Sequence, residues 1–359
     1  MDERATKETV DVLIRGAGPV GCALALALRD SGLRVSILDS SFQKKSVPFR
    51  PIALSYASRL ILERVGAWEG LSATPIETVL VSQHGGFGRT RLDALDAGVP
   101  ALGYVTEYAS LLASLETKIE QHGIRKTREE TRALCEVHAE GVAQDAEEKR
   151  YRQDAVVALV QLAPPAGNTA HERFTPEGPL ALLPHAGRYA LVWSANPGRA
   201  RSLAECPENE FLNELSAAAG TRIGAPVAVE SRAVQPLTLR VRPARTGERC
   251  VYIGNAAQTL HPVAGQGLNL GLRDAWDLAQ ILRAAHDPGD AATLARYAAS
   301  RRLDVQATIR VTDLLAGIFL GSGRLGRASR AAVLTALDIF PAPRRFFARR
   351  MIYGPSALP

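Results

Sequence analysis

Residues 9–39 read TVDVLIRGAGPVGCALALALRDSGLRVSILD, and this stretch decides the fold of the amino-terminal part of the chain. The apolar run TVDVLIR predicts a buried strand, the turn GAGPVG follows it, and the alanine- and leucine-rich run after the turn predicts a helix. LRVSIL predicts a second strand. A strand, a glycine-rich turn, a helix and a strand within about 30 residues are typical of a parallel sheet that binds a dinucleotide.

Each glycine of the turn has a physical role in this prediction. Gly16 allows the tight turn, Gly18 lets the backbone approach a pyrophosphate at the helix N-terminus, and Gly21 lets helix and strand pack closely. Asp39 ends the second strand, where a carboxylate can accept hydrogen bonds from an adenosine ribose. Arg15 places a charge at the end of a strand that should be buried, so it either reaches the phosphates or costs stability.

The rest of the chain predicts a second unit that interrupts the first. Helical apolar spacing covers residues 55–65 and 107–122, and the chain is again helical in character from 301 onward. Runs typical of strands cover 76–95, 151–161, 180–185 and 189–194. This order predicts an α/β fold: a Rossmann-like domain interrupted by an antiparallel-sheet substrate domain, with a helical C-terminal region.

We expect three structural parts with discontinuous boundaries. The nucleotide-binding domain comprises residues 1–75, 103–150 and 245–300, the substrate domain 76–102 and 151–244, and the helical C-terminal region 301–359.

Composition excludes several classes of protein. The chain has 359 residues, of which 46% are hydrophobic and 22% charged, as is typical of a soluble globular protein. Its four cysteines form no CxxC pair, and no apolar stretch reaches the roughly 18 residues of a membrane span, so we expect a reduced, cytoplasmic setting. The seven histidines lack the spacing of metal ligands, so we expect no metal.

A second glycine-rich turn lies at residues 252–275, which read YIGNAAQTLHPVAGQGLNLGLRDA. The run CVYI at 250–253 predicts a short strand, Gly254 turns the chain, and apolar residues recur at helical spacing from Gln266 onward. The stretch holds no catalytic triad and no set of metal ligands. It therefore predicts a wall that binds a cofactor rather than a set of catalytic side chains.

The chain resembles a known family through these stretches. IGNAAQTLHPVAGQGLNLGLRDA, together with DVLIRGAGPVGCALALALRDSGLRVSILD, RPIALSYASRLILERVGAW, HERFTPEGPLALLP and LDIFPAPRR, covers most of the chain in the family's order. The resemblance is to FAD-dependent aromatic hydroxylases of the p-hydroxybenzoate hydroxylase fold, and specifically to their ubiquinone-biosynthesis branch, the 2-polyprenylphenol hydroxylase type. Asn255 replaces the acid usual in the family's Gly-Asp motif. The Rossmann-like domain is then an FAD-binding domain.

The resemblance implies hydroxylation of the aromatic ring of a polyprenyl phenol in ubiquinone biosynthesis. FAD carries the chemistry through a flavin hydroperoxide formed with O2 after reduction by NADPH or NADH. His261 and Pro262 are the candidates beside the ring, and His261 either handles a proton or only packs and forms hydrogen bonds. The predicted cofactor-binding residues are Gly16, Ala17, Gly18, Gly21, Asp39, Arg50, Asn255, Gly265, Gln266, Gly267, Leu268 and Asn269.

One departure from the family is the absence of its Asp-Gly segment. No Asp-Gly dipeptide occurs in the chain, and residues 136–161 read EVHAEGVAQDAEEKRYRQDAVVALVQ in its place. We therefore expect a strand and a loop of the family's layout to be missing, which would remove a cofactor contact and leave neighbouring strands unpaired unless the fold closes around the gap. This keeps open a non-catalytic scaffold of the same fold in a complex of ubiquinone-pathway enzymes, or another flavin reaction such as reduction of a prenyl chain.

The C-terminal region is basic. From Arg296 onward it contains 11 arginines, no lysine and three aspartates, whereas the whole chain carries a net charge of +6. Two interpretations remain open: peripheral contact with the inner face of a membrane, or a helical tail packed on its own core. Nucleic acid is not expected, because no recognition motif accompanies the charge. The residues concerned are Arg324, Arg327, Arg330, Arg344, Arg345, Arg349 and Arg350, interleaved with Phe340, Phe346, Phe347, Ile352 and Tyr353.

Overall fold

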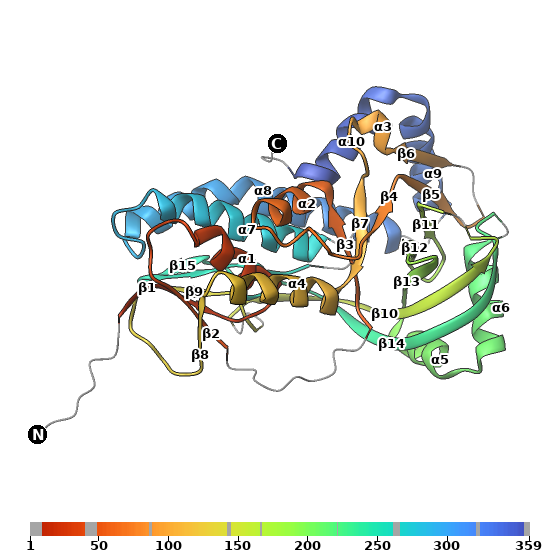
Figure 1. Ribbon diagram of the computed structural model, residues 1–359. Coiled ribbons are helices and arrows are strands. Elements are labelled where there is room, and N and C mark those ends of the chain that lie inside the picture. Colours follow the sequence, from red (N-terminus) through yellow and green to blue (C-terminus); the bar gives the residue numbers. More distant parts are fainter. Residues whose placement is uncertain are drawn as a thin grey trace, which may run out of the picture.

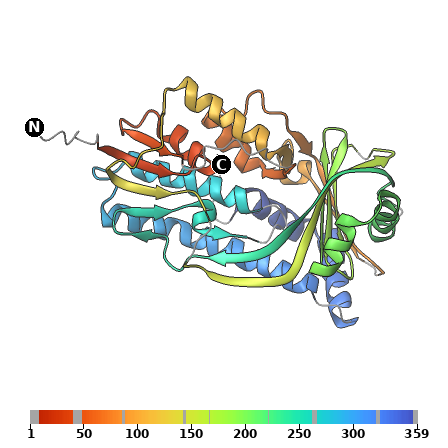
Figure 2. The same ribbon diagram turned by 90° about the horizontal axis from the view of Figure 1, so that it is seen from below.

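The computed structural model describes most of the chain. The described residues are 9–39, 49–85, 88–141, 145–165, 167–220, 222–260, 266–320 and 324–354, and the side chains of residues 152 and 311–330 lie outside the description. Within these residues the strands form three sheets, of six, eight and three strands, with helices packed around them (Figures 1 and 2).

The six-stranded sheet lies at the left-hand end of the molecule in Figure 1. In spatial order it contains β15 (Thr246–Gly247), β16 (Cys250–Tyr252), β9 (Ala133–His138), β1 (Val10–Arg15), β2 (Val35–Leu38) and β8 (Arg125–Thr127). Neighbouring strands are parallel, whereas β15 is antiparallel to β16. The predicted β-α-β unit is confirmed, because β1 pairs with β2 and helix α1 (Pro19–Leu28) connects them.

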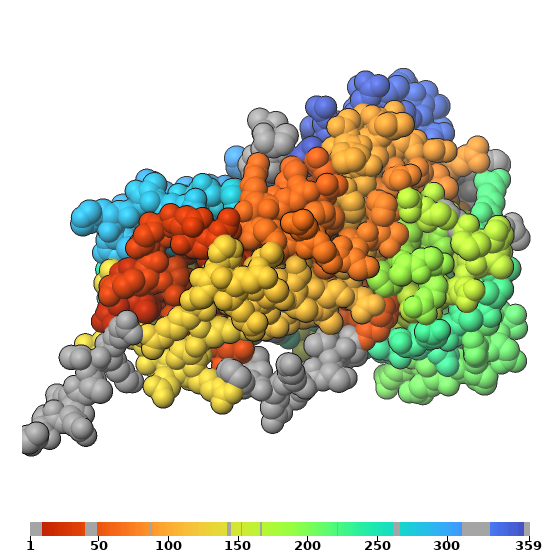
Figure 3. Space-filling view, viewed as in Figure 1, coloured from red at the N-terminus to blue at the C-terminus, as the bar shows by residue number. Residues whose placement is uncertain are grey.

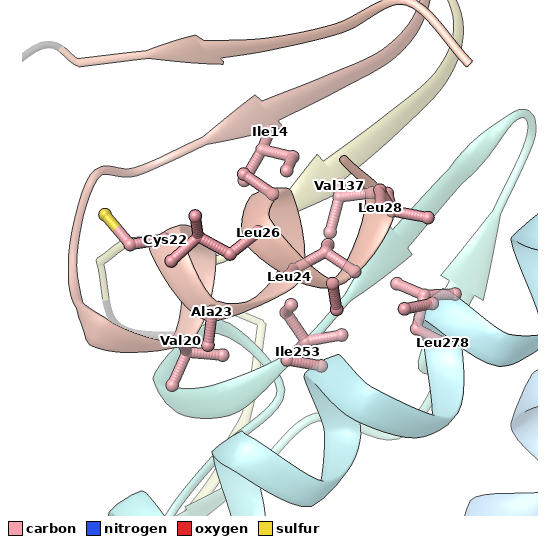
Figure 4. Packing of buried hydrophobic residues seen from close by; sticks show 14 of the residues in the cluster. Ile14, Val20, Cys22, Ala23, Leu24, Leu26, Leu28, Val137, Ile253 and Leu278 are labelled. Atoms are coloured by element: carbon pink, nitrogen blue, oxygen red, sulfur yellow. The ribbon is translucent and has the colours of Figure 1, made fainter. Parts of the chain in front are cut away.

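Helix α1 is buried along its whole length because it packs between this sheet and helix α7 (Gln266–Arg283). Figure 4 shows Leu24 of α1 among the side chains of the core that also contains Val137 of β9. This approach requires glycine at position 21, since a Cβ there would lie 2.1 Å from the carbonyl oxygen of Gly16. The packing role predicted for Gly21 is therefore confirmed.

Strand β9 fills the position where we expected a strand to be missing. It lies between β1 and β16 and pairs in parallel with both. The sheet has no gap at this point, so neighbouring strands are not left unpaired there. The absence of the Asp-Gly dipeptide does not leave the sheet unpaired, because pairing with β1 and β16 depends on the apolar strand β9, which is present. Glu140 and Gly141 follow β9, and Glu140 lies against the first glycine turn, its Cβ 2.5 Å from the place of a Cβ on Gly16.

Arg15, at the end of β1, finds its partners within the protein. Its Nη1 atom lies 2.7 Å from Oε1 of Glu130, and its Nε atom lies 2.9 Å from Oε2 of Glu136. The hydrogen bonds with Glu130 and Glu136 raise the pKa of the guanidinium. The charge at the strand end is thus compensated by the chain itself, which answers the question that the sequence left open.

The eight-stranded sheet forms the opposite end of the molecule (Figure 1). In spatial order it contains β17 (Gln258–Thr259), β14 (Ala225–Val241), β10 (Glu147–Ala163), β13 (Arg188–Ala195), β12 (Pro179–His185), β11 (Thr169–Phe174), β5 (Thr78–Gln83) and β6 (Arg89–Asp93). Its neighbours are antiparallel as predicted, except that β5 and β11 are parallel. Helices α5 (Pro197–Glu205) and α6 (Glu208–Ala219) cover one face and bury Trp193 against Phe211.

A small sheet lies between the two larger ones (Figure 1). It contains β3 (Pro51–Ser55), β7 (Gly103–Glu107) and β4 (Thr74–Ile76). Helices α2 (Tyr56–Arg64) and α4 (Tyr108–Gln121) follow β3 and β7, which confirms both helices predicted from apolar spacing.

Helices make up the described part of the C-terminal region, as predicted. Helix α8 (Ala291–Leu320) packs on α7, whereas α9 (Arg324–Ile339) packs on β6 and α10 (Pro341–Tyr353) on α3 (Ala94–Ala97). In the space-filling view the blue C-terminal helices lie over the orange segment that contains α3 (Figure 3). Helix α8 runs across residue 300, where one domain boundary was expected, and the division of the chain into domains stays our proposal.

Candidate functional site

A cavity of about 1100 Å³ lies where the sheets and the C-terminal helices meet. Its walls come from the first glycine turn, from one face of the eight-stranded sheet, and from helices α7, α9 and α10. Apolar side chains dominate these walls, among them Val81, Leu183 and Leu334. Arg50 and Glu172 are the charged residues in its described lining.

The first glycine turn forms one end of the cavity. Gly18 lines it and is the N-cap residue of α1, so the N-cap position supplies no side chain to bind the first N–H groups of that helix. The first N–H groups of an α-helix have no partners within the helix. Those of α1 can therefore bind a phosphate, as predicted for this turn.

The second glycine turn lies beside the first. Helix α7 approaches closely because Gly271 has no side chain: a Cβ there would lie 2.8 Å from Cγ2 of Val20 and 3.2 Å from Cα of Gly254. Asn255 is exposed toward solvent or the cavity that it lines, and a Cβ on Gly267 would meet no atom of the described residues within 4 Å. This part of the cavity is therefore open to a bound molecule.

Gln266, Gly267 and Leu268 line the cavity at the first turn of α7. The positive end of the helix dipole favours negative charge at this place.

Arg50 borders the first glycine turn through Tyr108. The guanidinium carbon lies 5.1 Å from the centre of the Tyr108 ring, and the Tyr108 hydroxyl lies 3.6 Å from the place of a Cβ on Gly18. Burial raises the pKa of Tyr108, and the Arg50 charge opposes that shift. A cation thus lies close to the helix N-terminus at which phosphates are predicted.

The side chain of Asn269 forms hydrogen bonds with other parts of the protein, although the residue lines the cavity. Its Oδ1 atom accepts hydrogen bonds from the Ser55 N–H group (2.8 Å) and from the Ser58 hydroxyl (2.7 Å), and its Nδ2 donates to the Ala53 carbonyl (2.9 Å). Only 2% of the residue is exposed. We assign this side chain a structural role: it joins the start of α7 to β3 and α2.

The other predicted residues divide into two groups. One group does not line the cavity and belongs to the β1–α1 turn, α1 and the end of β2: Gly16, Ala17, Gly21 and Asp39. The other group, His261, Pro262 and Gly265, lies outside the described residues.

Asp274, which sequence reasoning missed, fixes the second glycine turn. Its carboxylate accepts hydrogen bonds from the Gly254 N–H group (3.3 Å) and the Gln258 amide (2.8 Å), and lies 2.8 Å from Nε of Arg301. Burial alone would raise the pKa of Asp274, but the charges of Arg245 and Arg301 outweigh it and lower the pKa. Sequence spacing gave no signal for this role, because Arg301 comes from the following helix.

The described residues fit an FAD. The uncapped start of α1 and the charge of Arg50 suit a pyrophosphate, and the start of α7 beside open space at Gly267 suits an electron-rich ring. Apolar walls extend beyond that place toward α9 and α10.

Comparison with known proteins agrees with this geometry. Residues 9–159 and 120–312 match a family described as an FAD binding domain. The chain belongs to this family. The FAD-dependent hydroxylase is 30% identical to a ubiquinone hydroxylase of Rhodospirillum rubrum, over 95% of this chain and 89% of the relative. It is 28% identical to the 3-demethoxyubiquinol 3-hydroxylase of Escherichia coli, over 83% of this chain and 87% of the relative.

Solved structures share the fold of this hydroxylase. The PqsL protein of Pseudomonas aeruginosa in complex with 2-aminobenzoylacetate has a TM-score of 0.75 at 23% identity, over 91% of this chain and 100% of that one. The p-nitrophenol 4-monooxygenase of Pseudomonas putida has a TM-score of 0.78 at 17% identity, over 95% and 97%. The predicted resemblance is confirmed: the protein is an FAD-dependent aromatic-ring monooxygenase that uses NAD(P)H.

Proposed function

We propose that this hydroxylase acts on the aromatic ring of a polyprenyl phenol in ubiquinone biosynthesis. The observation that carries the proposal is the continuous cavity of about 1100 Å³, which begins at the glycine turns and continues between apolar walls to α9 and α10. A ring placed near Gly267 would leave its apolar tail along those walls. The names of the relatives from Rhodospirillum rubrum and Escherichia coli support ubiquinone biosynthesis as the pathway.

The chain's own residues have to bind and orient the reactants. When bound, FAD supplies the oxygen-transfer chemistry after its reduction by NAD(P)H. The start of α1 and Arg50 would hold its phosphates, and the start of α7 would stabilise negative charge on its ring. The apolar walls around Val81 and Leu183 exclude water from the place where the substrate ring would lie.

We also propose that the substrate arrives from an anionic membrane surface through the turn between α9 and α10. Ile339, Phe340 and Phe346 are 63%, 57% and 73% exposed, and Arg345 and Arg349 beside them are exposed as well. These five residues are called the α9–α10 patch. Other residues of the same two helices line the cavity. One face of α9 and α10 therefore borders the cavity, and another is exposed to solvent. No helix in the described part of the chain is both long and apolar enough to cross a bilayer.

Visible spectroscopy and turnover test the proposed function together. The purified protein, after addition of FAD and removal of the excess, is expected to show flavin absorption. It is further expected to oxidise NAD(P)H and to convert a prenylated phenol, such as a geranyl-substituted phenol, into a product that is heavier by one oxygen atom in mass spectrometry. Flavin binding with NAD(P)H oxidation but no oxygenated product would contradict the substrate assignment.

The scaffold alternative makes the opposite prediction. It was raised by the missing Asp-Gly dipeptide, yet β9 is present and paired on both sides. A protein that is colourless after addition of FAD and removal of the excess would support the scaffold and exclude the hydroxylation proposed here.

A further inference from the structure

Glu172 lines the cavity, and the side chains directly beside it in the sheet are apolar. Across the sheet, Glu172 of β11 is in register with Val81 of β5 and with Ala181 of β12. Along the same face of β11, the adjacent side chains are those of Ala170 and Phe174, because side chains alternate along a strand. All four residues line the cavity, and none of their side chains can form a hydrogen bond with the carboxyl group.

No hydrogen bond or ion pair joins Glu172 to another described residue. Thr90 has the next polar side chain in the same row, but it lies two strands away, at about 10 Å from the spacing of strands. Glu172 is only half-buried, which we attribute to exposure toward the cavity that it lines. The carboxyl group is thus accessible to a molecule in the cavity and has no partner among the described residues.

Burial raises the pKa of Glu172, and among the described residues no charged side chain offsets this effect. The other charged or titratable residues in the described lining are Arg50 and Tyr108, which border the glycine turn. On β11 itself His171 and Arg173 are adjacent in sequence and therefore project to the opposite face. On β5 and β12 the facing residues, Val81 and Ala181, carry no charge.

We propose that Glu172 binds the ring hydroxyl of the phenolic substrate by accepting a hydrogen bond from it. This inference rests on the proposed function and names the residue that orients the substrate. A hydroxyl that donates to a carboxylate forms a charge-assisted bond, which is stronger than one between neutral groups. Such a bond fixes the ring in the cavity and increases electron density on the carbon atoms that are to be hydroxylated.

A binding experiment isolates this bond from catalysis. A geranyl-substituted phenol and its O-methyl ether, which lacks the donor, are titrated calorimetrically into the oxidised FAD-loaded protein without NAD(P)H. The phenol is expected to bind roughly ten- to a hundredfold more tightly than the ether. The titration is repeated over a range of pH: where Glu172 is protonated in the free protein, binding of the phenol is expected to release protons, seen as a dependence of the heat on the buffer, because a hydrogen-bond donor lowers the pKa of Glu172.

Three variants decide between this role and a general effect on packing. Glu172→Leu should lose both the preference for the phenol and the proton release. Glu172→Gln should retain part of the preference, because an amide oxygen accepts hydrogen bonds, but release no protons. Thr90→Val removes another polar group of the same row and should retain both properties.

Several outcomes would overturn the inference. If Glu172→Leu prefers the phenol as strongly as the wild type, or if Glu172→Gln still releases protons, another group binds the hydroxyl. If Glu172→Leu does not fold, the test rests on Glu172→Gln alone: proton release by this variant contradicts the inference, and its loss supports the inference. If the wild type binds neither compound, the proposed function fails together with this inference, whereas binding with an unchanged preference in the variants contradicts the inference alone.

Discussion

Gly267 and Gly21 belong to two similar glycine turns but have different surroundings. A Cβ on Gly267 would extend into open space, whereas a Cβ on Gly21 would lie 2.1 Å from the backbone of Gly16. A substitution at Gly267 therefore reports on a bound molecule, and the same substitution at Gly21 reports on the fold.

We predict that Gly267→Val abolishes retention of FAD without lowering the melting temperature of the FAD-free protein. Gly21→Val should instead destabilise the FAD-free protein by about 3 kcal/mol, because the carbonyl oxygen of Gly16 cannot move away. Flavin absorption after gel filtration and thermal unfolding of the FAD-free forms measure both effects. Unchanged flavin content in Gly267→Val would contradict the placement of the flavin ring beside α7.

For single residues, the sequence predicts the position in the fold better than the contacts of the side chain. Asn269 was predicted to bind the cofactor, and its position in the cavity wall agrees, but its side chain bonds to Ser55, Ser58 and Ala53. Those partners lie more than 200 positions earlier in the chain, with a separation of 214 for Ser55. No local pattern reports such a partner.

Among the elements, α7 and α8 are joined by a buried network of charges. Arg301 of α8 lies 2.8 Å from Oδ1 of Asp274 and 2.6 Å from Oδ2 of both Asp277 and Asp304. Arg301 is 1% exposed, so water compensates these charges very little. Because Asp274 also binds the Gly254 N–H group, this network supports the second glycine turn.

We predict that Arg301→Met lowers the free energy of unfolding by about 3–5 kcal/mol, because it leaves buried carboxylates without their partner. Arg91→Met is the matched control: it breaks a 2.8 Å pair with Asp93 in which the arginine is 63% exposed, and it should cost less than about 1 kcal/mol. Chemical denaturation at neutral pH measures both. Equal losses in the two variants would show that the network contributes no more than a surface pair.

The same network predicts a dependence of stability on pH. Burial would raise the pKa of Asp304, but the charges of Arg273 and Arg301 lower it below the usual 3.8. The pKa of Asp274 is lowered in the same way by the charges of Arg245 and Arg301. A lowered carboxylate pKa stabilises the fold above about pH 4, and this contribution is lost as the pH falls through the folded-state value. Asp277, whose pKa burial raises, acts in the opposite direction. Arg301→Met should therefore lose less stability on acidification than the wild type.

Elements with strong local patterns could be predicted from the sequence, and their pairing could not. The first β-α-β unit and helices α2 and α4 lie where apolar spacing placed them. The position of β9 between β1 and β16, and the parallel pairing of β5 with β11, depend on contacts between distant segments. A missing dipeptide motif suggested a missing strand, although ALCEVH at 133–138 has the apolar character that a strand needs.

For the molecule as a whole, the α9–α10 patch leads to a prediction about where the enzyme works. The wild type should float with vesicles that contain anionic phospholipid and bind less at high salt, because arginines and apolar side chains act together. Phe340→Ser with Phe346→Ser should reduce the bound fraction at least tenfold, since each loses a buried apolar contact with the bilayer. Vesicle flotation measures the bound fraction.

The control for this experiment is an exposed apolar residue elsewhere on the molecule. Val227, in the first part of β14, is 48% exposed, and Val227→Ser should leave vesicle binding unchanged. Equal binding of the wild type to neutral and anionic vesicles would exclude the arginines, and no binding to either would exclude the patch as a membrane contact.

The order of strands in the six-stranded sheet also determines when this protein can finish folding during its synthesis. β1 and β2 are made first, but β16 is complete only at Tyr252, and Asn269 bonds back to Ser55 across 214 positions. At roughly 5–20 residues per second, the ribosome takes on the order of ten seconds or more to supply these partners. During that interval α7 has not been synthesised and cannot cover helix α1. We therefore expect the nascent chain to expose the face of this apolar helix that α7 covers until the second glycine turn has emerged.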